Sequence, residues 1–362
     1  MSGRLTRAIG LMSGTSLDGI DAAFIETDGE ATVIPGPAFT RPYDPALRRR
    51  LQAVLGGKGD VAGVERQLTL AHVDAVRALV AEHGIAGVDV VGFHGHTILH
   101  RPDQRRTWQI GDGALLARLT GLAVVADFRS ADVAAGGEGA PFAPLFHAAL
   151  ASALAKPLAV LNLGGVGNVT WIGAGAGDLL AFDTGPANAL IDDWALAHTG
   201  VPVDRDGALA LTGRVDQAHL ARFLAHPFFR RPPPKSLDRD DFAGFVPTGL
   251  SAADGAATLT AMTAAAVARA VEHFPAPPRR WLVTGGGRHN PALMAELARR
   301  LGVPVEPVER AGWNGDALEA QAFGYLAVRS LAGLPLSLPG TTGVPAPMRG
   351  GVLHPAGVAG PG

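Results

Sequence analysis

Apolar residues form two patterns along the chain, short uninterrupted runs and longer stretches with a helical period. The runs predict buried strands, because strands covered on both faces keep few polar positions. Strands are predicted at residues 7–12, 20–27, 31–35, 88–97, 122–128, 179–185 and 280–287, with two more inside residues 157–173. Helices are predicted at residues 60–83, 114–119, 186–198, 252–273, 291–301 and 317–331. Strands and helices therefore alternate, which is typical of an α/β protein.

The strand pattern at the beginning of the chain is written a second time. Residues 7–27 read as a strand, a polar loop and a strand, and residues 157–173 repeat this order with a glycine-rich loop. Residues 229–242 lack an apolar period, so we expect a charged surface excursion there. The proline- and glycine-rich tail from Pro335 is too short for a further domain.

Composition narrows the class of protein. The chain has 362 residues, of which 47% are hydrophobic and 18% charged, so it is long enough for two domains with apolar cores. Its formal net charge is -2, and it lacks the basic surplus that binds nucleic acid or an anionic membrane. Neither partner is expected, and the sequence leaves a homodimer open.

The chain contains no cysteine, which excludes disulfides, thiolate nucleophiles and cysteine-ligated metals. Its first apolar stretch is interrupted by Ser13, Thr15 and Asp18 and makes a poor signal peptide. No apolar segment approaches the length of a membrane span. We therefore expect a cytoplasmic protein.

The first loop joins two strands through residues that suit phosphate. Hydroxyl groups, backbone N–H groups and a carboxylate follow one another in this loop, and a tight turn would need fewer residues. No lysine of a Walker loop follows, and the glycines do not open a helix as in a Rossmann fold. The predicted ATP-binding residues here are Ser13, Gly14, Thr15, Ser16, Leu17, Asp18 and Gly19.

Two later glycine-rich turns fit the same ligand. The loop in the repeated motif predicts a second phosphate site, although a plain hairpin turn is the alternative. A strand that runs into three glycines and a helix predicts the adenosine site. The residues are Gly164, Gly165, Gly167 and Asn168 in the second loop, and Gly285, Gly286 and Gly287 in the third turn.

Seven motifs together resemble one known family. They are LMSGTSLDGID, GFHGHT, ADFRSADVAAGGEGAPFAP, LNLGGVGNVT, FDTGPANALID, VTGGGRHNP and EAQAFGYLA. In this order they resemble the anhydro-N-acetylmuramic acid kinases of the sugar kinase, Hsp70 and actin superfamily. The resemblance implies a two-domain actin-like ATPase (ribonuclease H-like) fold, with duplicated mixed sheets around a cleft. The expected domains are residues 1–128, joined by the tail 350–362, and residues 129–349.

The resemblance also implies an activity. The family opens the 1,6-anhydro ring of its sugar with water and phosphorylates O6, using ATP and Mg²⁺, in cell-wall recycling. Opening an internal acetal needs a water activated by a carboxylate, and Asp183 ends a predicted strand. The resemblance places Glu319 near the same water, although a solvated surface glutamate is the alternative. Asp18 is the candidate Mg²⁺ ligand.

A third set of residues is expected to bind the sugar. The guanidinium of Arg129 suits the lactyl carboxylate of muramic acid, with an ion pair to Asp127 or Asp132 as the alternative. Two histidines near one another make a weak metal site, so hydrogen bonding to sugar or plain packing is expected of them. The predicted substrate-binding residues are His94, His96, Thr97, Arg129 and Asp183.

Two other functions remain open at this point. An Hsp70-like or actin-like ATPase module would share the fold, because fold does not fix function. A kinase of an ordinary free sugar would need one base, whereas Asp183 and Glu319 offer two carboxylates.

Overall fold

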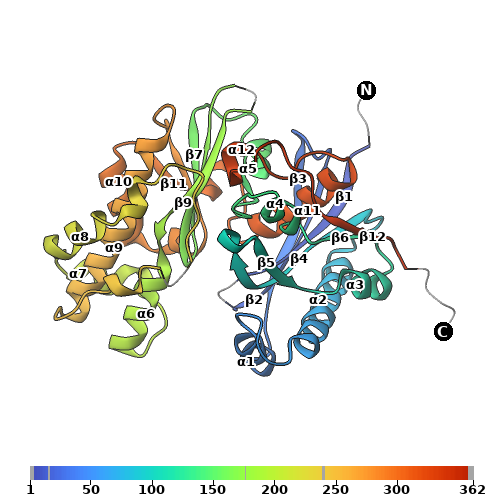
Figure 1. Cartoon of the computed structure of the whole chain (residues 1–362), viewed down its shortest axis with the longest axis horizontal. Coiled ribbons are helices and arrows are strands. Elements are labelled where there is room, and N and C mark those ends of the chain that lie inside the picture. The colour runs from blue at the N-terminus through green and yellow to red at the C-terminus, as the bar shows by residue number, and fades with distance from the viewer. Residues whose placement is uncertain (1–3, 15–16, 176, 239–240, 358–362) are drawn as a thin grey trace. The chain divides into compact units, whose positions relative to one another are not determined.

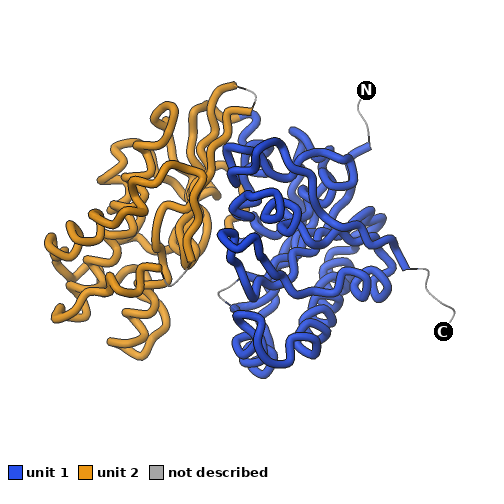
Figure 2. Tube along the Cα trace, viewed as in Figure 1, with its two compact units in different colours: residues 1–153, 316–362 blue, residues 154–315 orange. Residues whose placement is uncertain are grey.

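A computed structural model describes residues 4–14, 17–175, 177–238 and 241–357. The chain divides into two compact units (Figure 2). Unit 1 comprises Met1–Ala153 and Asp316–Gly362, and unit 2 comprises Leu154–Gly315. Each unit contains one mixed sheet with helices packed on it, as the alternation of strands and helices predicts.

The sheet of unit 1 has the strand order β12-β6-β4-β1-β2-β3, with β5 paired to β4. Its strands are β1 (Thr6–Ser13), β2 (Gly19–Thr27), β3 (Val33–Pro42), β4 (Val90–Arg101), β5 (Arg106–Ile110), β6 (Val124–Ala126) and β12 (Val352–His354). β1, β2 and β3 form an antiparallel meander, and β4 and β6 add to it in parallel through β1.

The sheet of unit 2 repeats this topology in the order β11-β10-β7-β8-β9. Its strands are β7 (Leu158–Leu163), β8 (Val166–Ile172), β9 (Leu179–Pro186), β10 (Trp281–Thr284) and β11 (Val305–Pro307). β7, β8 and β9 again form an antiparallel meander, with β10 and β11 added in parallel through β7. The predicted α/β class with duplicated mixed sheets is therefore confirmed.

The helices of unit 1 include two that come late in the sequence, α11 and α12 (Figure 1). They are α1 (Pro45–Ala53), α2 (Val61–His83), α3 (Gly113–Thr120), α4 (Ser130–Ala134), α5 (Pro144–Leu150), α11 (Leu318–Leu331) and α12 (Pro339–Thr342), with the 3₁₀ turn η1 (Pro102–Gln104). The predicted long helix begins after Asp60, whose side chain accepts from the Gly63 N–H, and ends at Gly84 with a φ of 60°.

α11 packs directly on the sheet of unit 1 because glycine removes the side chains between them. A Cβ added at Gly10 would lie 1.7 Å from the Ala320 carbonyl oxygen, and one at Gly92 would lie 2.0 Å from that of Phe323. This close approach ties residues 316–349 to unit 1, and residues 129–153 also pack there. The division therefore differs from the predicted boundary, which assigned both segments to the second domain.

The helices of unit 2 enclose a separate apolar core. They are α6 (Asn188–Thr199), α7 (Ala208–Thr212), α8 (Gln217–Leu224), α9 (Ala252–Ala270) and α10 (Pro291–Leu301), with 3₁₀ turns η2 (Arg205–Gly207), η3 (Pro227–Arg230), η4 (Ala243–Phe245), η5 (Val271–His273), η6 (Gly286–His289) and η7 (Val308–Ala311). Among the described residues, no helix combines the length and apolarity needed to cross a bilayer.

The expected surface excursion at residues 229–242 is wrong in part. Phe229 and Phe242 belong to a buried aromatic cluster with Phe223 and Phe228, and Lys235 is only 3% exposed. Residues 231–238 form no regular helix or strand, yet the aromatic side chains at either end of the segment still bury apolar surface. The lack of an apolar period in residues 229–242 therefore did not indicate a fully solvent-exposed segment.

Candidate active site

Asp183 lies on β9 with its carboxylate held in place. Its side chain is 8% exposed, and its Oδ2 accepts a hydrogen bond of 2.8 Å from the Leu237 N–H. Its own N–H donates to the Lys235 carbonyl at 2.9 Å, and Asn168 is its cross-strand partner on β8. A carboxylate held in a fixed direction is suited to accept a proton from a water placed beside it.

The β7–β8 turn is anchored to the first turn of α6. The Gly164 carbonyl accepts from the Asn188 N–H at 2.9 Å, and the Gly165 carbonyl accepts from the Ala187 N–H at 2.9 Å. The Asn188 side chain donates from Nδ2 to the Leu163 carbonyl at 2.7 Å. With a further bond from the Ala189 N–H to the Gly165 carbonyl at 3.2 Å, four hydrogen bonds fix the turn, and in all four its carbonyl groups accept.

The Gly285–Gly287 turn packs against the end of β7. Gly285 has a φ of 76°, and a Cβ there would lie 2.4 Å from Asn162 Oδ1. A Cβ at Gly287 would lie 2.6 Å from the Leu163 Cβ. These two glycines are required by the protein's own packing, which brings this turn and the β7–β8 turn side by side.

Three glycines of these turns are not required by packing. A Cβ at Gly286 would come no nearer than 3.8 Å to another residue, and those at Gly164 and Gly165 no nearer than 3.6 Å. None of the three has a left-handed φ. Because packing does not require glycine at these three positions, the space beside their backbone is available for the close approach of a ligand. By contrast, Gly167 packs on Thr184, where a Cβ would lie 2.7 Å from Oγ1.

The first predicted loop, in unit 1, begins at a buried hydroxyl. Ser13 is 1% exposed, and its Oγ forms hydrogen bonds with the Tyr43 hydroxyl and, at 2.9 Å, with His96 Nδ1. Leu17 has a φ of 59° and donates to the Gly14 carbonyl at 3.1 Å. Thr15 and Ser16 lie outside the described residues. Burial lowers the pKa of His96 to about 4, so its ring is neutral at pH 7.

Carboxylates follow this loop. The Asp18 side chain is 73% exposed and lies 3.9 Å from the Arg48 guanidinium. Gly19 is a packing glycine, because its Cβ would lie 2.3 Å from the Arg41 carbonyl oxygen. Asp21 was not among the residues predicted from the sequence. Burial raises its pKa, and the negative charges of Asp316 and Asp18 raise it further. Among the described residues, no group of three or more histidines or acidic residues could hold a metal ion.

Buried His94 and half-buried Arg129 form a pair in unit 1. Arg129 donates from Nε to His94 Nε2 at 2.9 Å and from Nη1 to the Gly139 carbonyl at 2.6 Å. The opposite nitrogen of His94, Nδ1, lies 2.9 Å from the Gly95 carbonyl and carries the proton. Burial first, and then the charge of Arg129, lower the pKa of His94 well below its usual value. The ring is therefore neutral.

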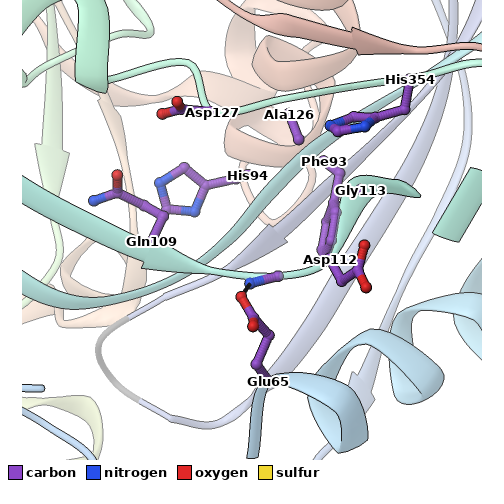
Figure 3. Close-up of a pocket in the computed structure, with 10 residues that line it drawn as sticks. Glu65, Phe93, His94, Gln109, Asp112, Gly113, Ala126, Asp127 and His354 are labelled. Atoms are coloured by element: carbon purple, nitrogen blue, oxygen red, sulfur yellow. Dashed lines mark hydrogen bonds between the residues drawn. The ribbon is translucent and has the colours of Figure 1, made fainter. Parts of the chain in front are cut away.

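His94 lines a pocket of about 300 Å³ within unit 1 (Figure 3). The Gln109 amide, also on its wall, donates to Thr97 Oγ1 at 3.1 Å, and the Glu65 carboxylate accepts from the Gly111 N–H at 2.9 Å. Of the polar residues on the wall, the sequence prediction included His94 and missed the others, while the predicted Thr97 contacts the wall through Gln109. The missed residues are Glu65, Gln109, Asp112, Asp127 and His354.

The two predicted catalytic carboxylates belong to different units. Asp183 is in unit 2, whereas Glu319 is an exposed residue in the first turn of α11 in unit 1. The neighbours of Glu319 along the helix, Leu318 and Ala320, are buried. The packing of α11 therefore directs Glu319 away from the sheet.

A family model for anhydro-N-acetylmuramic acid kinase matches residues 6–356. The chain belongs to this family. The resemblance predicted from the seven motifs is thus confirmed. A relative from Paramagnetospirillum magneticum with the same name is 64% identical over 352 residues, which cover 96% of this chain and 99% of the relative. One from Rhodospirillum rubrum is 59% identical, with 96% and 94% covered.

Solved structures of sugar kinases resemble the chain more distantly. A glucokinase from Streptomyces griseus is 15% identical with a TM-score of 0.40, and covers 88% of this chain and 99% of its own. A xylulose kinase from Lactobacillus acidophilus is 10% identical with a TM-score of 0.44, and covers 91% of this chain and 90% of its own.

Proposed function

We propose that this chain is an ATP-dependent kinase of 1,6-anhydro-N-acetylmuramic acid. It opens the anhydro ring with water and phosphorylates O6, giving N-acetylmuramic acid 6-phosphate for peptidoglycan recycling. The observation that carries the proposal is the family match over residues 6–356, together with a relative of that name that is 64% identical. Use of ATP favours a cytoplasmic location, and a homodimer stays a prediction.

Asp183 is the proposed general base. Its carboxylate takes a proton from water, the water oxygen bonds to C1 of the sugar, and the bond from C1 to O6 breaks. The released O6 then bonds to the γ-phosphorus as ADP leaves. The hydrogen bond from the Leu237 N–H supports this role, because it orients the carboxylate before the sugar binds. Glu319 is the proposed second carboxylate of the ring opening.

The glycine turns are proposed to bind ATP through backbone groups. Gly164, Gly165 and Gly286 have room where a side chain would stand, and their turns are held rigidly by Asn188 and the end of β7. Preorganised N–H donors stabilise a transferring phosphoryl group because they need no reorganisation during the reaction. In unit 1, residues 13–19 are proposed to act in the same way.

Asp18 is the proposed Mg²⁺ ligand. Proteins commonly hold Mg²⁺ through one or two carboxylates together with substrate phosphates and water. The exposed carboxylate of Asp18 fits this mode, and the carboxylates of Asp21 and Asp316 add negative charge nearby. When bound, the ion supplies positive charge that neutralises the phosphates.

The sugar is proposed to contact the pocket that His94 lines. Neutral His94 on the pocket wall offers a hydrogen-bonding group, and Thr97, whose hydroxyl accepts from Gln109 of the same wall, follows His96 on β4. Arg129 adds a positive charge behind His94, which favours a carboxylate such as the lactyl group.

Product mass provides the test. The protein is incubated with ATP, Mg²⁺ and the anhydro sugar, and the sugar product is analysed by mass spectrometry. We expect the sugar to gain one water and one phosphoryl group. Hydrolysis of ATP with unchanged sugar would favour an Hsp70-like or actin-like module. Phosphorylation of free sugars alone would identify a different sugar kinase.

A further inference from the structure

Lys235 is a buried cation that none of the steps above uses. It is 3% exposed, and lysine is almost never buried without a partner. Its Nζ donates to the Phe228 carbonyl at 3.0 Å and lies 4.5 Å from the centre of the Phe228 ring and 5.6 Å from that of Phe182. Such cation–π contacts strengthen when the cation is removed from water. Through these contacts the ammonium holds residue 235 against η3 and β9.

The backbone on both sides of this lysine contacts Asp183. The Lys235 carbonyl accepts from the Asp183 N–H at 2.9 Å, and the Leu237 N–H donates to Asp183 Oδ2 at 2.8 Å. Residues 235–237 thus contact both the main chain and the carboxylate of Asp183. They form no regular helix or strand of their own, so their position depends on anchors outside the segment.

The charged groups around Lys235 are mostly positive. His273 Nε2 lies 3.4 Å from Nζ and 3.1 Å from the Phe229 carbonyl. Burial first, and then the charges of Arg231 and Arg269, lower the pKa of Lys235 to about 8. Glu272 is paired with Arg269 at 2.8 Å. The ammonium is therefore charged at pH 7 but lies near its titration point.

We propose that Lys235 is a positioning residue, whose ammonium group pins residues 235–237 and thereby fixes the direction of the Asp183 carboxylate. The proposal rests on the proposed role of Asp183 as the base. The groups that hold the cation are the carbonyl and ring of Phe228 on η3 and the ring of Phe182 on β9. A small displacement of a catalytic group can cost a large factor in rate.

Kinetics of matched variants provide the first test. Lys235→Met keeps the length of the side chain and removes the charge and the N–H donors, so we expect kcat about tenfold lower with little change in KM for ATP. Lys235→Arg keeps a cation and should recover part of this loss. Lys58→Met, an exposed lysine in unit 1, is the control and should leave kcat unchanged. Equal kcat in wild type and Lys235→Met would overturn the proposal.

The pH dependence separates positioning from a merely structural role. Above about pH 8 the ammonium of the wild type loses its proton, so kcat should fall, whereas Lys235→Arg stays charged and should retain its rate. With three lysines in the chain, ¹³C labelling at lysine Cε gives few resonances, and the one missing in Lys235→Met reports the titration directly. Parallel pH profiles in the wild type and Lys235→Arg would contradict the proposal.

A measurement without substrate keeps this test independent of the proposed function. The ¹³Cγ resonance of Asp183, identified by its loss in Asp183→Asn, should shift or broaden in Lys235→Met. An unchanged resonance would overturn the positioning role even if the enzyme turns over. Conversely, a shifted resonance in a protein that does not convert the anhydro sugar would support the positioning role and contradict the proposed function.

Discussion

The first hairpins of the two sheets occupy the same place in the same topology, yet they present different groups. In unit 1 the β1–β2 connection carries polar side chains, from the buried Ser13 to the exposed Asp18. In unit 2 the β7–β8 connection is the short turn of Gly164 and Gly165, held by α6. Topology thus fixes where each hairpin lies in its sheet, while the turn residues decide which groups it offers a ligand.

The candidate carboxylates differ in the same way. Asp183 in unit 2 is buried and held by a backbone N–H, whereas Glu319 in unit 1 is exposed on a helix. Electrostatic interactions of a buried carboxylate are screened less by water than those of an exposed one. We therefore expect the larger catalytic contribution from unit 2.

Asp183→Asn should have the largest effect. The amide keeps the shape of the side chain but cannot accept the proton from water, so kcat should fall about a hundredfold or more. ATP affinity, measured by calorimetry, should stay near the wild-type value. Asp74→Asn, an exposed aspartate on α2, is the control. A near-normal kcat of Asp183→Asn would contradict the assignment of Asp183 as the general base.

Glu319→Gln should have a smaller effect, a fall in kcat of about tenfold, because an exposed carboxylate is less preorganised. Adding Asp183→Asn should lower kcat by less than the product of the two single effects, since both carboxylates serve one step. Glu82→Gln, exposed on α2, is the control. Fully multiplicative losses would assign the two carboxylates to separate steps.

Gly286→Val and Gly14→Val probe the nucleotide turns of the two units. A valine should fill space that ATP needs, so each variant should weaken ATP binding about tenfold in calorimetry. The control is Gly244→Val, because a Cβ there meets no atom within 4 Å and its φ is ordinary. Unchanged affinity in both turn variants would contradict the proposed ATP site.

The smallest effect at neutral pH concerns stability. Burial lowers the pKa of His72, His96 and His147, all in unit 1, to about 4. Because the unfolded value is near 6.5, the unfolded chain takes up protons first, and the free energy of unfolding should fall as pH drops from about 6.5 to about 4. His72→Gln should reduce this slope, and exposed His83→Gln should not. Denaturant unfolding across this pH range measures the free energy of unfolding and therefore its slope with pH.

Much of the fold could be predicted because local patterns carry it. The buried strands read as apolar runs, and α2 and α10 begin and end at capping residues with clear signatures, such as Asp60 and Gly302. The packing of α11 on the first sheet could not be predicted from the sequence, because it depends on the contact of Gly10 and Gly92 with a helix more than 200 residues away. Single glycines in strands do not reveal their distant partner.

Asp183 and Gly164 could be proposed from the sequence because each stands where a motif joins a strand to a loop. Candidate residues that tertiary packing brings together could not be proposed in this way. Lys235 stands in a charged stretch that reads as solvated, and only the fold buries it among phenylalanines. Glu65 and His354 come from remote elements, so no local pattern indicates that they line one pocket.

The reaction run in ¹⁸O-labelled water tests the central claim most directly, namely that water opens the ring while O6 takes the phosphoryl group. The account predicts one labelled oxygen at C1 of the sugar, measured after short reaction times, and none in the phosphate. Loss of the incorporation in Asp183→Asn, with Asp74→Asn unaffected, would connect it to the proposed base. Label in inorganic phosphate with the anhydro sugar unchanged would contradict the account.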